Sequence, residues 1–126
     1  MKTLSLNIAI AVVIVVIACG SWFGLKKIKC RQRGAVLARR VESIKQDAHE
    51  RLKIGTKRDD VSRFFVEHAI PFEILDSEAI GTLRTSGCAP LGCGTDSALI
   101  GVRVKLDRDG TVTHEPTVVD MYTDCL

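Results

Sequence analysis

The segment from residue 3 to residue 25 contains no charged side chain. Residues 8 to 17 within it are all isoleucine, valine or alanine, without the polar positions that an amphipathic soluble helix would show. In a helix, about 20 residues cross a hydrocarbon core of about 30 Å. Trp22 and Lys26 then fall where an aromatic ring and an ammonium group meet the membrane interface. The segment therefore predicts a membrane-spanning helix rather than the core helix of a soluble protein.

Two alternatives to an uncleaved single-pass helix stay open. Residues 16 to 19, Val-Ile-Ala-Cys, resemble a bacterial lipobox, in which Cys19 is lipidated and becomes the new N-terminus. Against this, apolar residues follow Cys19, and Lys2 is the sole charge before the segment. An ordinary cleaved secretory signal ends at an A-x-A-like site, and no convincing site occurs here. An uncleaved helix fits the sequence best.

Charge divides the rest of the chain into two regions. Residues 26 to 53 hold ten basic and three acidic side chains, whereas residues 54 to 126 hold seven basic and twelve acidic ones. A basic stretch beside an apolar segment suits anionic lipid headgroups. Because basic and aromatic residues are not interleaved in the acidic region, we expect no nucleic-acid partner. We expect contact with membrane lipid through residues 3 to 25 and through the basic collar at residues 26 to 40.

Two signals disagree about the side of the membrane on which the soluble part lies. The positive-inside rule counts Lys and Arg near the ends of the segment, and the C-terminal flank exceeds the N-terminal one. This favours a cytoplasmic domain. The cysteines, and the family resemblance given below, favour an extracytoplasmic domain. The sequence predicts a single-pass membrane protein and leaves its orientation open, with the extracytoplasmic side preferred.

We expect an anchor at residues 1 to 25, a basic juxtamembrane region with a helix at residues 26 to 53, and a small α+β domain at residues 54 to 126. The helix is predicted over residues 35 to 52. Its apolar residues recur three or four positions apart: Leu37, Val41, Ile44, Ala48 and Leu52. One interpretation is a stalk that dimerises as a coiled coil. We favour a helix packed on its own domain, because the stripe barely exceeds two heptads.

The segment from residue 54 to residue 61 predicts the end of one helix and the start of the next. Gly55 can end the first helix in a left-handed conformation. Thr56 is the expected N-terminal cap of the second helix, with Asp59 three positions later completing a variant capping box. Pro71 stops this helix. Its apolar positions follow helical spacing: Val61, Phe64, Phe65 and Ala69.

Strands are predicted for the remainder of the chain. The alternation of apolar and polar residues from Ile100 to Leu106 is the period of a half-buried strand. Shorter candidates are residues 72 to 75, 79 to 84, 111 to 115 and 118 to 123. The order of elements indicates an α+β fold: an N-terminal transmembrane helix, then two helices packed on a three- to four-stranded antiparallel β-meander.

The stretch Gly-Thr-Lys-Arg-Asp-Asp-Val at residues 55 to 61, followed by this order of elements through Thr123, resembles the SmpA/OmlA-type lipoprotein domain of the outer-membrane assembly machinery. More broadly, it resembles the β-lactamase-inhibitor-protein-like fold. In that superfamily a Gly-Met/Thr-Ser/Thr-x-x-Glu/Asp-Val stretch opens a helix before a β-meander. The resemblance implies a non-enzymatic protein of the bacterial cell envelope.

The cysteines are the main candidates for chemistry. Cys88 and Cys93 are separated by four residues, a spacing that can close a small disulfide in an oxidising compartment. Unpaired thiols are the alternative, and a zinc site would need a different spacing and further ligands, with His114 and Cys125 as candidates. Cys19 and Cys30 are expected to be inert or lipidated.

Other motifs are better explained by structure than by catalysis. Residues 107 to 110, Asp-Arg-Asp-Gly, look like half of a calcium loop, but the twelfth position is Val118, which cannot bind calcium. A hairpin turn with Gly110 in a left-handed conformation explains them. The three histidines are isolated in sequence, and no nucleophile elbow, phosphate loop or HExxH motif occurs. We expect no enzymatic activity and no cofactor.

Two functions are consistent with this sequence. The first is a membrane-anchored, non-enzymatic interaction module of the cell envelope, which binds an unidentified protein or envelope component through its open sheet face or its cysteine loop. The alternative is a thiol redox or metal-binding membrane protein that uses Cys88 and Cys93. Free-thiol counting and zinc analysis of the protein isolated from cells separate these two hypotheses.

Overall fold

The computed structural model describes residues 2 to 125, and side chains from residue 6 onward. The chain divides into two compact units, Met1–Gln32 and Arg33–Leu126. Helix α1 (Lys2–Arg51) contributes to both. The expected boundary at residue 54 lies inside the second unit, because the C-terminal third of α1 packs on the sheet.

The first unit consists of the N-terminal part of α1. An 18-residue stretch of this helix has a mean hydropathy of 2.6, and none of it is buried. Its apolar side chains lie on all sides of the helix and are exposed. The ammonium group of Lys26 lies 5.5 Å from the centre of the Trp22 ring. The structure confirms a helix near the N-terminus that is long and apolar enough to cross a membrane.

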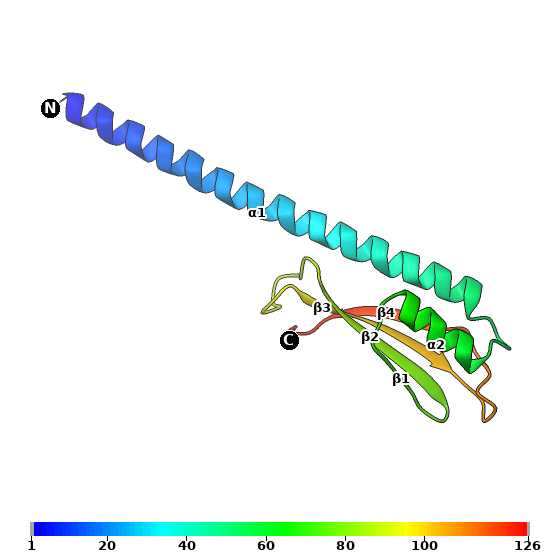
Figure 1. The fold of residues 1–126 in the computed structure, drawn as a ribbon. Coiled ribbons are helices and arrows are strands. Elements are labelled where there is room, and N and C mark those ends of the chain that lie inside the picture. Colours follow the sequence, from blue (N-terminus) through cyan, green and yellow to red (C-terminus); the bar gives the residue numbers. More distant parts are fainter. Residues whose placement is uncertain (1, 126) are drawn as a thin grey trace. The chain divides into compact units, whose positions relative to one another are not determined.

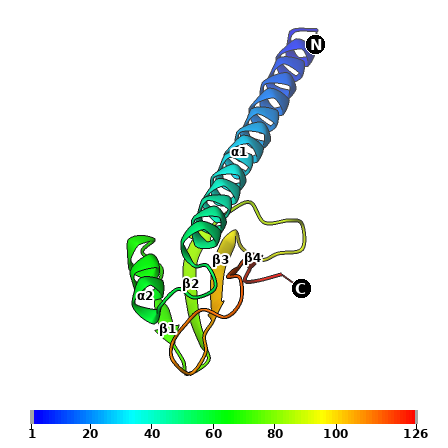
Figure 2. The same cartoon turned by 90° about the vertical axis from the view of Figure 1, so that its right-hand side faces the viewer.

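The second unit is an α+β domain (Figures 1 and 2). It contains the end of α1, a second helix, and a four-stranded antiparallel sheet in the order β1-β2-β3-β4. Both helical segments lie on one face of this sheet (Figure 2). The predicted fold class is confirmed. The elements after α1 are α2 (Arg58–Glu67), β1 (Phe72–Ile74), β2 (Glu78–Ser86), β3 (Ser97–Lys105) and β4 (Thr117–Tyr122).

The core lies between the helices and the inner face of the sheet. Leu37, Ile44 and Ala48 of α1 are buried in it, as the spacing of this stripe predicted for a helix packed on its own domain. Phe64 and Phe65 of α2 are both fully buried. Burying one such side chain contributes about 1.5 to 3 kcal/mol. The inner face of the sheet supplies alternate residues: Ala79, Ala98, Ile100, Val102 and Val104.

Gly81 in β2 allows α2 to approach the sheet closely. A Cβ at this position would lie 2.3 Å from the Phe65 ring. Phe65 also stacks on Phe72 of β1, the residue paired with Gly81, with ring centres 5.0 Å apart and planes 13° apart. The lack of a side chain at Gly81 therefore makes room for the Phe65 ring of α2 on the sheet.

The strand predicted at residues 111 to 115 is present only as a short antiparallel return, and the ladder partner of β3 is β4. Val112 forms an isolated bridge with Leu106, while Asp107 donates to Thr111 and Thr113 donates to Lys105. The backbone of Val112 also bonds to the α1–α2 connection: its N–H donates to Thr56, and its carbonyl accepts from Gly55. The preceding turn has the expected form, with Gly110 at φ 77° and the Asp107 carboxylate accepting from two backbone N–H groups.

Helix α2 ends in a left-handed turn without glycine. Ala69 has φ 53°, and the N–H of Ile70 donates to the carbonyl of Phe65, which is the pattern of a Schellman motif. Pro71 follows and cannot continue a helix. The backbone thus leaves α2 sharply, which places Phe72 at the start of β1 under the Phe65 ring.

Candidate interaction surfaces

The cysteine loop (residues 87 to 96) joins β2 to β3 and is tied to the C-terminal segment. Cys93 forms a disulfide with Cys125. The predicted pairing of Cys93 with Cys88 is therefore wrong. Cys88 and Cys30 are disulfide-bonded as well. Cys19, the candidate for lipidation, has a free and exposed thiol.

Sheet register explains the observed disulfide. The antiparallel pairing of β3 with β4 continues past the strands, where Thr123 donates to Ser97 and Gly94 donates to Asp124. Cys93 and Cys125 then face each other as an isolated bridge. Sequence spacing alone does not contain this information, because it requires knowing which strand pairs with β3.

The tip of the cysteine loop is a tight turn. The N–H of Cys93 donates to the carbonyl of Pro90 at 3.3 Å, and Gly92 has φ 102°. This is the form of a type II turn, in which a left-handed residue stands in the third position. Leu91, in the second position, is fully exposed. The turn therefore presents an apolar side chain directly to the surroundings.

The base of the loop is held by side chains from three elements. Asp96 accepts from the N–H of Ala89 at 3.0 Å and forms an ion pair with Arg33 of α1 at 3.3 Å. The Tyr122 hydroxyl accepts from the N–H of Cys88 and donates to its carbonyl, at 3.1 and 3.0 Å. With the disulfide, these contacts fix both arms of the loop.

The second candidate surface is the outer face of the sheet, opposite the helices (Figure 1). Leu99 of β3 pairs with Met121 of β4, and Gly101 pairs with Val119. Val119 and Met121 are 45% and 54% exposed. These three apolar side chains, Leu99, Val119 and Met121, form what we call the β3–β4 patch. Charged side chains border it: Arg84, which pairs with Leu99, and Arg103, which follows Gly101 on the same face.

The patch reaches an edge of the sheet, because β4 is the last strand in the order. Thr123 donates its N–H toward β3. In an antiparallel pair, successive residues alternate between facing the partner strand and facing away. The backbone groups of Val118, Asp120 and Tyr122 therefore point away from β3. An exposed carboxylate at Asp120 is a common way to limit uncontrolled pairing at such an edge.

A charged cluster joins α1 to α2. His68 Nε2 lies 2.7 Å from Asp47 Oδ2, and Arg51 contacts the carboxylates of both Asp47 and Glu67. The hydrogen bond from His68, and then the charge of Arg51, lower the pKa of Asp47 against the opposing effect of burial. The hydrogen bond from Arg51 likewise lowers the pKa of Glu67. The cluster stabilises the packing of the two helices.

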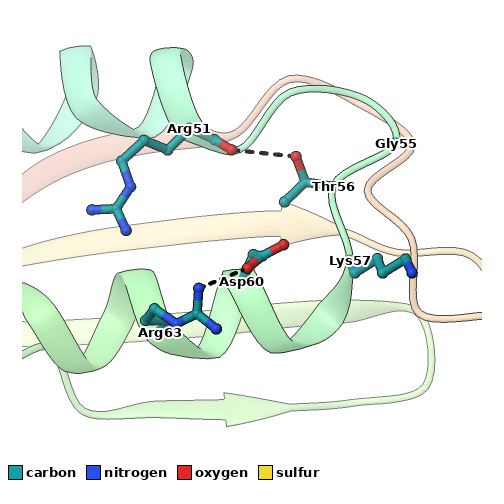
Figure 3. A pocket seen from close by; sticks show the side chains of 6 residues that line it. All are labelled: Arg51, Gly55, Thr56, Lys57, Asp60 and Arg63. Carbon is teal, nitrogen blue, oxygen red and sulfur yellow. Dashed lines mark hydrogen bonds and ion pairs between the residues drawn. The ribbon is translucent and has the colours of Figure 1, made fainter.

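An open hollow lies between the end of α1 and the start of α2 (Figure 3). Its volume is about 640 Å³. Arg51, Lys57 and Arg63 line it together with a single acid, Asp60, which is paired with Arg63 at 3.1 Å. Figure 3 shows Lys57 extending away from this ion pair. The hollow is polar and wide, and nothing in it selects a particular ligand.

The predicted capping role of Thr56 is wrong. Its hydroxyl donates to the carbonyl of Arg51 at 3.3 Å and so serves the end of α1 (Figure 3). The N-cap of α2 is Lys57, without a side-chain cap bond. The physical cause is Gly55, whose φ of 95° turns the chain so that Thr56 faces backward. Asp59 and Asp60 in the first turn favour the helix N-terminus by charge alone.

Metal binding has no candidate among the described residues. In that part of the chain, no three His, Cys, Asp or Glu side chains are grouped so that they could hold an ion. Cys93, one member of the thiol pair proposed for redox or zinc chemistry, is bonded to Cys125. His114, the other candidate zinc ligand, contacts the hydroxyl of its neighbour Thr113.

No family model, curated protein or solved structure matches the chain. The resemblance of residues 55 to 61 to SmpA/OmlA-type domains stays a prediction.

Sequence reasoning missed the residues that now stand out on the surface. Leu91 lay in a loop identified by its cysteines, and its exposure follows from the turn around it. The β3–β4 patch combines residues from two strands, and the outward phase of Leu99 was visible in the alternation of β3. Its partners on β4 required the correct strand pairing.

Proposed function

We propose that this protein is a single-pass, membrane-anchored interaction module whose domain lies on the extracytoplasmic side and binds a protein partner. The β3–β4 patch carries the proposal. The apolar part of α1 supplies the anchor, and the basic collar at residues 26 to 40 contacts anionic headgroups. The module acts by binding and not by catalysis.

The patch has the composition of a small protein-binding surface. Leu99, Val119 and Met121 come together on neighbouring strands, and the rim is charged. Apolar patches with polar rims mark protein contacts, and Met adapts to different partner shapes. The free edge of β4 adds backbone groups that can pair with an extended segment of a partner.

The disulfides support the extracytoplasmic side. Cys93 is bonded to Cys125, and Cys30 and Cys88 are disulfide-bonded too. Such bonds persist in oxidising compartments and are rare in the cytosol of ordinary cells. The basic collar favours the opposite orientation by the positive-inside rule. We give the disulfides more weight because they involve four of the five cysteines.

Site-specific crosslinking in the native membrane tests the proposal. A photoreactive phenylalanine at Met121 should form one discrete adduct, whereas the same group at exposed Val66 on α2 should not. Val119→Asp should abolish the adduct from position 121, because a charge in the patch is costly to bury. Equal labelling from positions 66 and 121, or an adduct that survives Val119→Asp, would exclude the patch.

Orientation is tested separately. With the full-length chain in intact cells, a thiol reagent that cannot cross the membrane should label the domain after external reduction of Cys93–Cys125. Labelling only after permeabilisation would place the domain in the cytoplasm. Cys125→Ser is the matched control, because it leaves Cys93 without its partner and available without reduction.

A further inference from the structure

The geometry points to a second membrane contact: we propose that the tip of the cysteine loop inserts Leu91 into the lipid interface beside the anchor. This inference rests on the proposed membrane anchoring. It concerns a different surface from the β3–β4 patch and a different partner, the lipid bilayer itself.

The tip has the chemistry of a lipid contact. Leu91 is fully exposed at the second position of the turn. From residue 87 to residue 95 the loop carries no charged side chain. Insertion would therefore require no burial of a charge, which is the main cost of placing a polypeptide at the apolar boundary of a bilayer.

The loop is already ordered in the shape that insertion needs. The disulfide from Cys93 to Cys125, the ion pair of Asp96 with Arg33, and the hydroxyl of Tyr122 hold its two arms. Ordering a flexible loop would weaken a contact made by one side chain. A preorganised turn avoids this loss.

Chain length keeps the loop near the bilayer. Asp96 pairs with Arg33, the residue at which the second unit begins, and a Cβ at Gly34 would lie 3.3 Å from Cys88 Cβ. Eight positions lead from Leu25, the end of the uncharged segment, to Arg33. They span about 12 Å as a helix and at most about 28 Å fully extended, so the limit holds whatever angle the domain takes.

The short connection between the anchor and the domain strengthens a membrane contact that would be weak by itself. One leucine would not hold a free domain on a membrane. A short connection raises the effective concentration of the loop at the surface to the millimolar range or above. The basic side chains in the first part of the collar, at residues 26 to 31, add attraction to anionic headgroups.

Quenching by lipid tests the inference on the full-length protein. Trp22 is the sole tryptophan, so Trp22→Phe with Leu91→Trp places one reporter in the loop. The matched control is Trp22→Phe with Ile54→Trp, since Ile54 is also well exposed but lies beyond the other end of α1. Both are reconstituted in phosphatidylcholine and phosphatidylglycerol vesicles with brominated acyl chains.

We expect brominated lipid to reduce the emission at position 91 at least about twofold, as for a side chain within the headgroup–acyl boundary, and to leave position 54 unchanged. The effect should persist in pure phosphatidylcholine and in high salt, because residues 87 to 95, around the tip, carry no charged side chain. Quenching confined to anionic vesicles would show that the collar, and not Leu91, makes the contact.

The unmodified protein separates failure of this inference from failure of the anchor. Trp22 should be quenched in the same vesicles. Quenching at position 22 without quenching at position 91 overturns the loop contact and leaves the anchor standing. No quenching at position 22 overturns both. Because Leu91 makes no packing contact in the core, Leu91→Trp should keep the native circular dichroism and the Cys93–Cys125 disulfide.

Discussion

Two parts of helix α1 share the same α-helical backbone but distribute their apolar side chains differently. From residue 6 to residue 25 the helix is apolar on every side, and its side chains are exposed. From Arg33 to Arg51 a narrow stripe is buried against the domain while the remaining sides are polar. Both parts are helical, so helix formation does not distinguish them. The distribution of apolar side chains around the helix determines whether a part suits lipid or suits packing on a domain with its other sides in water.

The largest expected effect is the loss of the apolar part. Deleting residues 1 to 25 should release the protein from membranes, because no other long apolar run exists in the chain. Flotation on a lipid gradient after a high-salt wash measures this, since salt screens the residual attraction of the basic collar. Persistent flotation of the truncated chain would mean that the anchor is assigned to the wrong segment.

Within the domain, the core residues of α2 should be costly to truncate. Phe65→Ala should reduce the free energy of unfolding by about 3 to 5 kcal/mol, because the ring is fully buried against Gly81 and Phe72. From the helical pattern, we expect Phe64→Ala to cost less. Val66→Ala, at an exposed position between core residues of the same helix, is the control and should be nearly neutral. Denaturant titration of the soluble domain measures all three.

A matched pair of substitutions compares the two parts of α1 directly. Ile44→Ala should reduce the stability of the domain by about 2 to 5 kcal/mol, whereas Ile14→Ala should leave it unchanged. The two changes remove the same atoms from the same helix. Hydrogen exchange on the full-length protein in detergent reports the domain alone. A large effect of Ile14→Ala would show that the two parts are energetically coupled.

Substitutions just after the end of α1 should change the stability less. Gly55→Ala should cost about 1 kcal/mol, because φ is 95° there and a Cβ is penalised. Thr56→Ala should cost about 0.5 to 1.5 kcal/mol through the lost bond to the Arg51 carbonyl. Thr56→Ser keeps a donor and should be nearly neutral. Thr56→Asp cannot donate and should destabilise, whereas a true N-cap would tolerate it.

The smallest expected effect is on the pH dependence of the free energy of unfolding. The pKa of Asp47 is lowered in the folded state, so its contribution is complete above the ordinary pKa of about 4 and is lost as the pH falls through the folded value. Between pH 7 and pH 3 we expect Asp47→Asn to remove about 1 kcal/mol or less of pH dependence, given the exposure of the cluster. An unchanged profile in chemical denaturation would show that His68 and Arg51 do not stabilise the ionised carboxylate.

Local patterns predicted most of the fold. The apolar run, the helical stripe of α1 and the alternation of β3 each depend on residues close in sequence, and each was confirmed. The stripe of α2 was confirmed for Val61, Phe64 and Phe65, whereas Ala69 lies beyond the end of α2 and is exposed. The strand expected at residues 111 to 115 is shorter than predicted: only residues 111 to 113 return along residues 105 to 107, and Val112 also bonds to the distant segment at residues 55 and 56.

The surfaces were less predictable than the fold. The partner of Cys93 depends on the register of β4, which no local spacing encodes. Thr56 has the right chemistry for a cap, but Gly55 turns it toward the preceding helix. In both cases the residue type was identified correctly. The partner was set by strand register for Cys93 and by the backbone conformation of the neighbouring Gly55 for Thr56.

The disulfide between Cys93 and Cys125 also has a mechanical consequence. The bond closes a covalent ring over a sequence separation of 32 residues that includes β3 and β4. A pulling force applied at the C-terminal end would pass through the two sulfur atoms into the cysteine loop and would not unzip β4 from the sheet. In a single-molecule pulling experiment, removing this bond alone by Cys93→Ser with Cys125→Ser should lengthen the fully unfolded chain by about 110 Å, and β4 should then become the first element to detach under load.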